Sequence, residues 1–184
     1  MRNGPELWGL LLAALGVEGA VIGGGCIRDY ALGLAPKDYD IFVPIRRKKE
    51  LLDISNRITS LGVMGFEDEQ EDYHEESSVT GSLIGVMDGE LLDYPVNVIG
   101  RRSHLQGVEA LVDSFDFGCV QAAWSPTVGS VSTTAFVEDI LGSTATLRTN
   151  ATYDLSRCRF ERFNQRNPGV LTLVDPYQES FTFA

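Results

Sequence analysis

The stretch from residue 20 to residue 43 constrains the fold of this chain more than any other part of it. A short apolar run ends at the glycines Gly23 to Gly25, and residues 26–32 can form a helix. Pro36 prevents that helix from continuing, and residues 38–43 return to an extended pattern. This order predicts a strand, a glycine turn, a short helix and a second strand.

Two carboxylates lie on one face of the second predicted strand. Because side chains alternate along a strand, Asp38 and Asp40 point one way while Tyr39, Ile41 and Val43 point the other. Neighbouring carboxylates repel each other unless a cation lies between them, and oxygen ligands favour Mg²⁺ or Mn²⁺. The glycine turn, which opens a helix, offers backbone N–H groups to a phosphate. The two features together predict metal-assisted attack on a nucleoside triphosphate.

Two other kinds of glycine-rich site fit this turn poorly. A P-loop ends in Gly-Lys-Ser/Thr, and no such ending follows these glycines. A dinucleotide-binding turn needs a third glycine for close packing of helix and strand, and Arg28 stands at that position. It also needs an acidic residue at the end of the next strand, where the sequence has Val43-Pro44-Ile45.

The residues from the glycine pair onward form a specific pattern: Gly24-Gly25-x-x-Arg28-Asp29-x-x-x-Gly33-x-x-Pro36-Lys37-Asp38-x-Asp40. The pattern resembles the head-domain signature of tRNA CCA-adding enzymes and bacterial poly(A) polymerases, which belong to the polymerase-β-type nucleotidyltransferase superfamily. The resemblance implies two sets of site residues: Gly24, Gly25, Arg28 and Lys37 for the nucleotide, and Asp38 and Asp40 as catalytic metal ligands.

The resemblance also implies a third carboxylate on a later strand beside this pair. Residues 79–87 and 90–99 flank Asp88-Gly89, which is a strong signal for a two-residue hairpin. In the second arm, Asp93 and Asn97 share one face. Asp93 is therefore a candidate catalytic carboxylate, and Asn97 is a neutral alternative for the same position.

Residues 114–124 are similar to a second motif of the family, an Asp-Phe-Thr-x-Asn-Ala-like segment. Asp116, Phe117 and Ala123 match this motif, and Gln121 lies near the position of its asparagine. The resemblance implies that Asp116 contributes to nucleotide binding. A cap or turn residue is the alternative interpretation of Asp116.

The rest of the chain predicts secondary structure around this site. Apolar periodicity and breaking residues predict the following elements: a buried helix at 5–16, a helix at 50–61 preceded by the basic residues 46–49, a strand at 63–66, an exposed acidic loop at 67–78, a short helix at 109–113, strands at 132–137 and 144–148, an arginine-bearing helix at about 154–166 and an edge strand at 170–174.

The formal net charge of −11 limits the partners of this chain. A protein that binds a long nucleic acid usually has a basic face, because neutralising phosphates supplies most of the affinity. Any RNA is therefore expected to be held locally, by residues 46–49, by Arg101 and Arg102, or by the arginines of 154–166. No apolar run reaches membrane-spanning length, and the three widely spaced cysteines indicate reduced thiols in a cytoplasmic protein.

These observations predict one α+β domain over residues 1–184 with a polymerase-β-like nucleotidyltransferase fold, a mixed twisted sheet with helices mainly on one face. The favoured function is transfer of a nucleoside monophosphate from an NTP to a hydroxyl, with release of pyrophosphate, at two Mg²⁺ or Mn²⁺ ions held by Asp38 and Asp40. An RNA (tRNA-like) end is the preferred acceptor. The alternatives are a protein or small-molecule hydroxyl, and a non-catalytic module that binds nucleotide or a partner.

Overall fold

The computed structural model describes residues 4–60, 79–86, 95–149 and 151–178. Four features that the sequence predicts lie outside these residues: the strand at 63–66, the acidic loop at 67–78, the Asp88-Gly89 turn and Asp93.

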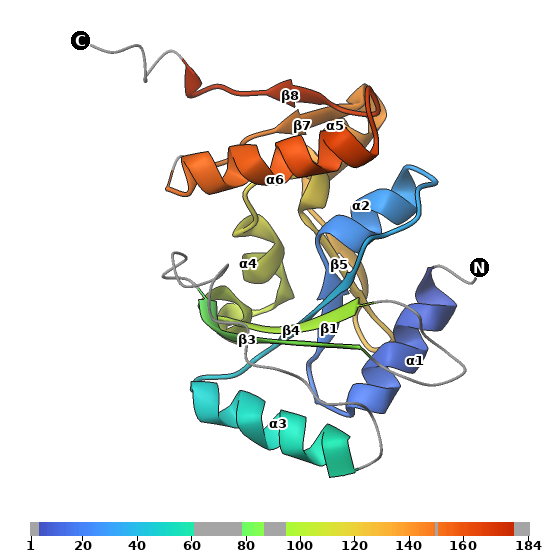
Figure 1. Cartoon of the computed structure of the whole chain (residues 1–184), viewed down its shortest axis with the longest axis vertical. Helices are drawn as coiled ribbons and strands as arrows, with labels where there is room; N and C mark the ends of the chain where they lie inside the picture. Colours follow the sequence, from blue (N-terminus) through green and yellow to red (C-terminus); the bar gives the residue numbers. More distant parts are fainter. Residues whose placement is uncertain (1–3, 61–78, 87–94, 150, 179–184) are drawn as a thin grey trace.

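A mixed sheet forms the centre of the molecule (Figure 1). Its strand order is β3-β4-β2-β1-β5-β6. The strands have these bounds: β1 Val21–Gly23, β2 Tyr39–Val43, β3 Val79–Val86, β4 Pro95–Arg101, β5 Ala122–Ser125 and β6 Gly129–Ser132. β2 and β4 pair in parallel, and the other neighbours pair antiparallel.

The strands predicted within residues 20–43 are confirmed as β1 and β2, which lie side by side in the sheet. The two arms predicted at 79–87 and 90–99 form the antiparallel pair β3–β4, although β4 begins only at Pro95. Proline lacks the N–H that a strand interior donates, so its place as the first residue of β4 is the one that a strand tolerates.

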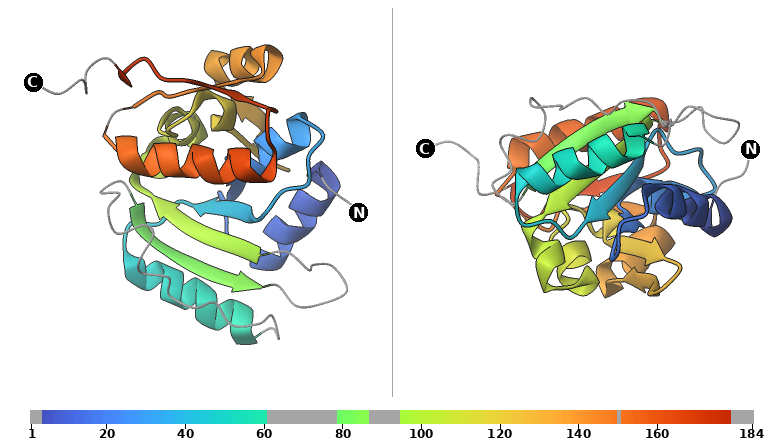
Figure 2. Two further views of the ribbon diagram at one scale, coloured as in Figure 1. Left: turned by 45° about the horizontal axis from the view of Figure 1, so that its top comes forward. Right: turned by 90° about the horizontal axis from the view of Figure 1, so that it is seen from below.

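Helices cover the two faces of this sheet unequally. α1 (Pro5–Leu15) and α3 (Lys48–Ser60) pack on one face, and Figure 2 shows α3 lying across it in the view from below. α2 (Gly25–Ala31) connects β1 to β2. The core under these helices contains Tyr39, Ile41 and Val43, as strand alternation predicts. On the opposite face, α4 (Val108–Asp113) packs with a smaller cluster around Phe42 and leaves part of the sheet for a cleft.

The C-terminal residues form a separate layer at the top of Figure 1, around a third apolar cluster. Its elements are α5 (Thr134–Gly142), β7 (Thr144–Thr146), α6 (Tyr153–Arg166) and β8 (Thr172–Val174), and the short 3₁₀ helix η2 (Gly118–Val120) packs against α5 and β7. A second 3₁₀ helix, η1 (Arg102–Gln106), lies between β4 and α4. The predicted helix at about 154–166 is confirmed as α6. The predicted edge strand is confirmed as β8, which pairs with β7.

The strand predicted at 132–137 is wrong, because most of that segment belongs to α5. Thr133 decides the local structure. Its hydroxyl accepts a hydrogen bond from the amide of Phe136 and caps the helix, and the same hydroxyl donates to Gln121 Oε1 at 2.9 Å. The β-branched residues that favoured a strand are outweighed by this cap and by its tertiary anchor.

Among the described residues, no helix combines the length and apolar character needed to cross a bilayer.

Candidate active-site cleft

A cleft of about 620 Å³ lies between the exposed face of β2 and β4 and the helix α6. Figure 2 shows α6 running above β2 in its left-hand view. The site residues predicted from the sequence that fall in the described part of the chain all line this cleft: Gly24, Gly25, Arg28, Lys37, Asp38, Asp40 and Asp116. The fold therefore gathers residues that are far apart in the sequence around one cavity.

The glycine turn is fixed by the sheet. Gly24 has a φ of 74° and a ψ of −134°, a conformation that side chains with a Cβ rarely adopt. Its N–H donates to the carbonyl of Ala122 on β5 at 3.0 Å, so this amide holds the turn in place. A Cβ on Gly24 would lie 3.7 Å from Asp40 Oδ2, so the turn brings bare backbone next to the carboxylates. Gly25 begins α2 with an ordinary φ.

The two carboxylates lie beside a neutral amide. Asp40 stands in register with Asn97 on the parallel neighbour β4, and Asn97 Nδ2 donates to Asp40 Oδ1 at 2.8 Å. The Asp38 side chain is 30% exposed at the cleft mouth, where its Oδ2 lies 3.5 Å from Lys37 Nζ. Asn97 thus lies beside Asp40, while Asp93, the other candidate for the third position, lies outside the described residues.

Burial makes Asp40 the unusual acid of the site. Desolvation, and then the charge of Asp38, raise the pKa of Asp40 to about 6. The hydrogen bond from Asn97 and the charges of Arg159 and Arg101 act in the opposite direction. Because ionising Asp40 in this site costs free energy, a cation beside it would stabilise the charged carboxylate strongly.

These residues suit a hard divalent cation. Mg²⁺ is commonly bound by one or two carboxylates and completes its shell with water and substrate phosphates. An ion between Asp38 and Asp40 would offset the repulsion that raises the pKa of Asp40. In the described part of the chain, no group of three or more His, Cys, Asp or Glu side chains is arranged to hold a metal. The described part of the protein therefore offers this ion only a partial shell.

Arg28 lines the cleft with its guanidinium group already engaged. Its Nε donates to Asp29 Oδ1 at 2.8 Å, and its Nη2 lies 2.6 Å from the same oxygen. The guanidinium carbon lies 3.9 Å from the ring centroid of Phe163 on α6. Arg28 thus joins α2 to α6. The sequence did not assign roles to Asp29 or Phe163, and no local pattern connects Phe163 to this site.

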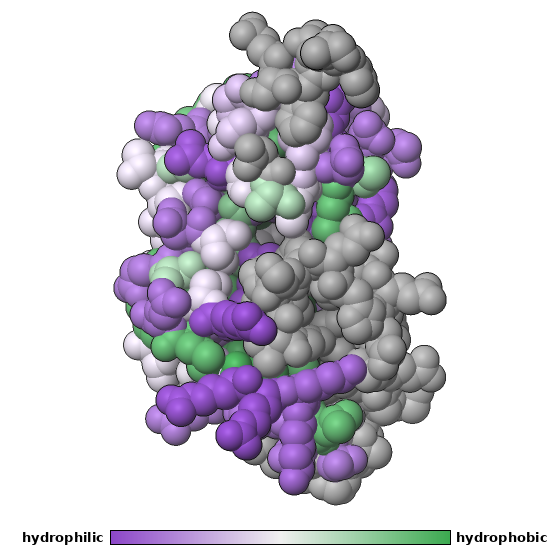
Figure 3. All heavy atoms as spheres, turned by 90° about the vertical axis from the view of Figure 1, so that its left-hand side faces the viewer, coloured by the Kyte–Doolittle hydropathy of each residue, from purple (hydrophilic) through white to green (hydrophobic). Residues whose placement is uncertain are grey.

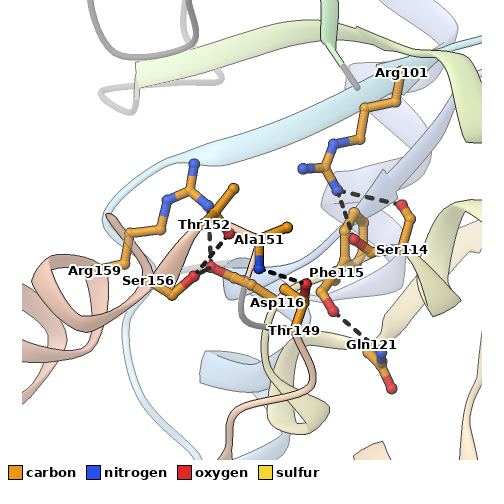
Figure 4. A network of polar contacts seen from close by, with 10 residues as sticks. All are labelled: Arg101, Ser114, Phe115, Asp116, Gln121, Thr149, Ala151, Thr152, Ser156 and Arg159. Atoms are coloured by element: carbon orange, nitrogen blue, oxygen red, sulfur yellow. Dashed lines mark hydrogen bonds and ion pairs between the residues drawn. The ribbon is translucent and has the colours of Figure 1, made fainter. Parts of the chain in front are cut away.

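Asp116 holds α6, which forms the wall of the cleft opposite β2 and β4 (Figure 4). Its Oδ2 accepts hydrogen bonds from Ser156 Oγ at 2.8 Å and from Arg159 Nη1 at 3.0 Å, both on α6. Its backbone carbonyl accepts from the amide of Arg148. These contacts give Asp116 a structural role in holding α6, in addition to its place on the cleft lining.

Arg101 lies on the other side of the same segment (Figure 4). Its Nη1 donates to the carbonyl and hydroxyl oxygens of Ser114, at 3.4 and 3.3 Å, and its guanidinium lies over the ring of Phe115. Gln121 Nε2 donates to the carbonyl of Phe115, which holds the backbone between Ser114 and Asp116. Residues 114–116 therefore anchor Arg101 towards one end of the cleft and Arg159 towards the other.

The basic residues 46–49 do not line the cleft. Arg46, Arg47 and Lys49 are exposed, and Arg47 donates its backbone amide to Glu50 Oε1 at the start of α3. Figure 3 shows hydrophilic side chains gathered over the lower part of the face where α3 begins. Any phosphate that these residues bind lies outside the cavity.

Comparisons with known proteins give the family. The model of the Gabija anti-defense 2 family (Gad2) matches residues 10–144, a range that includes the glycine turn, both aspartates and Asn97. The chain belongs to the Gabija anti-defense 2 family. No curated protein matches this Gad2 chain.

Solved structures similar to this Gad2 chain include CCA-adding enzymes. The Thermotoga maritima enzyme complexed with tRNA is 18% identical, with a TM-score of 0.64 over 97% of this chain and 42% of the enzyme. An apo form is 15% identical, with a TM-score of 0.65 over 97% of this chain and 42% of the enzyme. A complex with CTP is 18% identical, with a TM-score of 0.60 over 94% of this chain and 43% of the enzyme. The Gad2 chain thus spans less than half the length of these enzymes and shares their nucleotidyltransferase fold, as predicted.

Proposed function

We propose that this Gad2 protein binds a nucleoside triphosphate with a divalent cation in the cleft and transfers the nucleoside monophosphate to a hydroxyl, releasing pyrophosphate. One observation carries the proposal: the glycine turn and the Asp38–Asp40 pair meet in one cavity, with the Cβ position of Gly24 only 3.7 Å from Asp40 Oδ2. Backbone that can approach phosphates and carboxylates that suit Mg²⁺ or Mn²⁺ are the two elements that this chemistry requires.

In this proposal each group of residues around the cleft has its own task. Asp38 and Asp40 hold the cation, which when bound neutralises charge on the reacting phosphates and promotes attack by the hydroxyl. The turn at Gly24 and Gly25 lets the triphosphate approach the backbone. Lys37, 62% exposed at the cleft mouth, supplies a cation that can follow the phosphates. The proposal implies a cytoplasmic location, where NTPs are available.

For the acceptor we propose an RNA end. The basic side chains Arg101, Arg159, Arg162 and Arg166 line the cleft of a chain whose net charge is −11, so phosphate binding is concentrated at this place. The solved complex of the Thermotoga maritima enzyme contains tRNA, which is in line with this choice.

A protein hydroxyl is the second candidate acceptor. The overall acidity of the chain favours it, because a long nucleic acid would be repelled outside the cleft. The family name also refers to an anti-defence role against Gabija, so under this second candidate the acceptor hydroxyl would belong to a protein of that system.

The test supplies each α-labelled NTP with Mg²⁺ to the protein, together with total RNA or with cell protein, and follows the label. We expect label in RNA from one or a few NTPs. Asp40→Asn and Asp38→Asn should each lower transfer by at least about 100-fold, since the cation is then held by one carboxylate. Asp53→Asn, at an exposed acid of α3, is the control and should keep full transfer.

Label in protein would select the second candidate. If no acceptor is labelled although NTP binds with Mg²⁺, the chain is a nucleotide-binding module and the proposed transfer is wrong.

A further inference from the structure

Asn97 donates a hydrogen bond to Asp40, and the proposed function gives Asn97 no role. It is 7% exposed, it faces the cleft from the strand beside β2, and it stands in register with Asp40. Parallel pairing of β2 and β4 fixes this placement through the backbone, so the side chain at position 97 always meets Asp40.

The chemistry of the amide fixes its orientation. An ionised carboxylate only accepts hydrogen bonds, so the amide turns its NH₂ group to Asp40, as the 2.8 Å contact from Nδ2 shows. The NH₂ group carries no lone pair for a metal. Asn97 therefore occupies one oxygen of Asp40 and adds no negative charge beside it.

A pair of catalytic metal ions needs ligands on both sides of the reacting phosphate, for the attacking oxygen and for the leaving oxygen. An ion on the leaving side takes several oxygens from the triphosphate itself. An ion on the acceptor side must take its ligands mainly from the protein. Among the residues that the structure describes, that side offers Asp38 and Asp40, which both ions would share, and a neutral amide.

Arg101 adds to this effect. Its guanidinium lines the cleft on the same face of β4 as Asn97, since side chains two and four residues apart point the same way. A fixed positive charge there opposes a further cation at the acceptor side.

We propose that Asn97 limits this cleft to one tightly held divalent cation, the one that arrives with the triphosphate, and leaves the acceptor side without a resident ion. The inference rests on the proposed binding of an NTP with its cation. It makes Asn97 a positioning residue for Asp40 and the determinant of how many ions the site holds.

The experiment counts ions directly. Mn²⁺ binding to the full chain is measured by electron paramagnetic resonance with a non-hydrolysable NTP analogue present. We expect one tight Mn²⁺ per chain in the wild type and two in Asn97→Asp, whose second ion binds at least about tenfold more tightly than any second ion in the wild type, a difference of about 1.4 kcal/mol. Asn97→Ala, which adds no charge, should still hold one.

Thermal unfolding gives a second readout that does not depend on activity. In EDTA, Asn97→Asp should unfold at a lower temperature than the wild type, because two carboxylates then face each other without a cation. Added Mn²⁺ should raise its unfolding temperature by more than it raises that of the wild type. Equal responses of the two proteins to Mn²⁺ would overturn the proposal.

The number of Mn²⁺ ions that the wild type binds tests the inference even if the variants fold poorly. Two ions of similar affinity in the wild type would overturn the inference and leave the proposed nucleotide binding intact. If Asp93→Asn then removed one of the two ions, Asp93 would be the missing carboxylate. A wild type that binds neither the analogue nor Mn²⁺ would overturn the proposed function together with the inference.

Discussion

The two walls of the cleft are held in place by different kinds of interaction. The sheet wall is a backbone structure: β2 lies between β1 and β4, and the amide of Gly24 donates to the carbonyl of Ala122. The α6 wall is held by side chains, with Asp116 accepting from Ser156 and Arg159, and with Arg28 lying over the ring of Phe163.

This difference predicts which wall can move when side chains are substituted. The backbone hydrogen bonds of the sheet use no side-chain atoms, so we expect the position of Asp40 to survive most single substitutions around it. The position of α6 depends on a few side chains, each worth about 1 kcal/mol or somewhat more. We therefore expect the carboxylate site to be rigid and the width of the cleft to respond to single substitutions.

The largest effect is expected for Asp116→Ala, which removes the acceptor that Ser156 and Arg159 share. It should lower the free energy of unfolding by about 2–3 kcal/mol, because the buried Ser156 hydroxyl and the Arg159 guanidinium both lose the carboxylate that accepts from them. Hydrogen exchange should rise in residues 153–166 and stay unchanged in β1 and β2. Asp113→Ala, at an exposed acid nearby, is the control. An equal rise across both walls would remove the distinction between them.

A smaller loss is expected on the sheet wall for Gly24→Ala. The backbone of Gly24, with φ 74° and ψ −134°, lies in a region that alanine avoids, so this change should cost about 2 kcal/mol of stability, measured by urea unfolding. Gly25 has no such constraint, and a Cβ there would lie 3.5 Å from Arg28 Nη2, an ordinary contact. Gly25→Val should therefore keep the stability and lower NTP affinity by about tenfold or more by calorimetry. Equal losses of stability and affinity in Gly25→Val would reduce this turn to a structural role.

The contact between Arg28 and Phe163 should contribute less again. A double-mutant cycle of Arg28→Met and Phe163→Leu should give a coupling energy of about 0.5–1 kcal/mol, as expected for a cation above an aromatic ring. The same cycle with Phe160→Leu should give almost none, since Phe160 lies on α6 against Phe117. Coupling of the same size in both cycles would show that α6 responds as a whole.

The smallest effect concerns His104, on the sheet side, where burial lowers the pKa of the imidazole and contacts with the backbone of Gly19 and Val43 partly oppose this. The unfolded chain then binds the proton more readily than the folded chain. The stability is therefore complete above the unfolded pKa of about 6.5 and falls as the pH decreases through the folded pKa. His104→Gln should weaken this decrease in urea titrations at pH 7 and pH 5. An unchanged slope would place the titration elsewhere.

The sequence determined the parts of this protein that depend on neighbours in the chain. The order of strand, turn, helix and strand in residues 20–43 follows from apolar runs, glycines and Pro36, and alternation alone placed Asp38 and Asp40 on one face. The helix at 5–16 was also readable, because Pro5 begins it and Gly16 ends it in the left-handed conformation.

Only the tertiary structure decided which distant residues complete the cleft. The position of Asn97 beside Asp40 depends on the parallel register of β2 and β4, which no local pattern specifies. The tie between Asp116 and α6 and the start of α5 at Thr133 likewise depend on partners from other elements. Local propensities differ by only fractions of a kcal/mol per residue, so contacts made in the folded chain outweigh them where the two disagree.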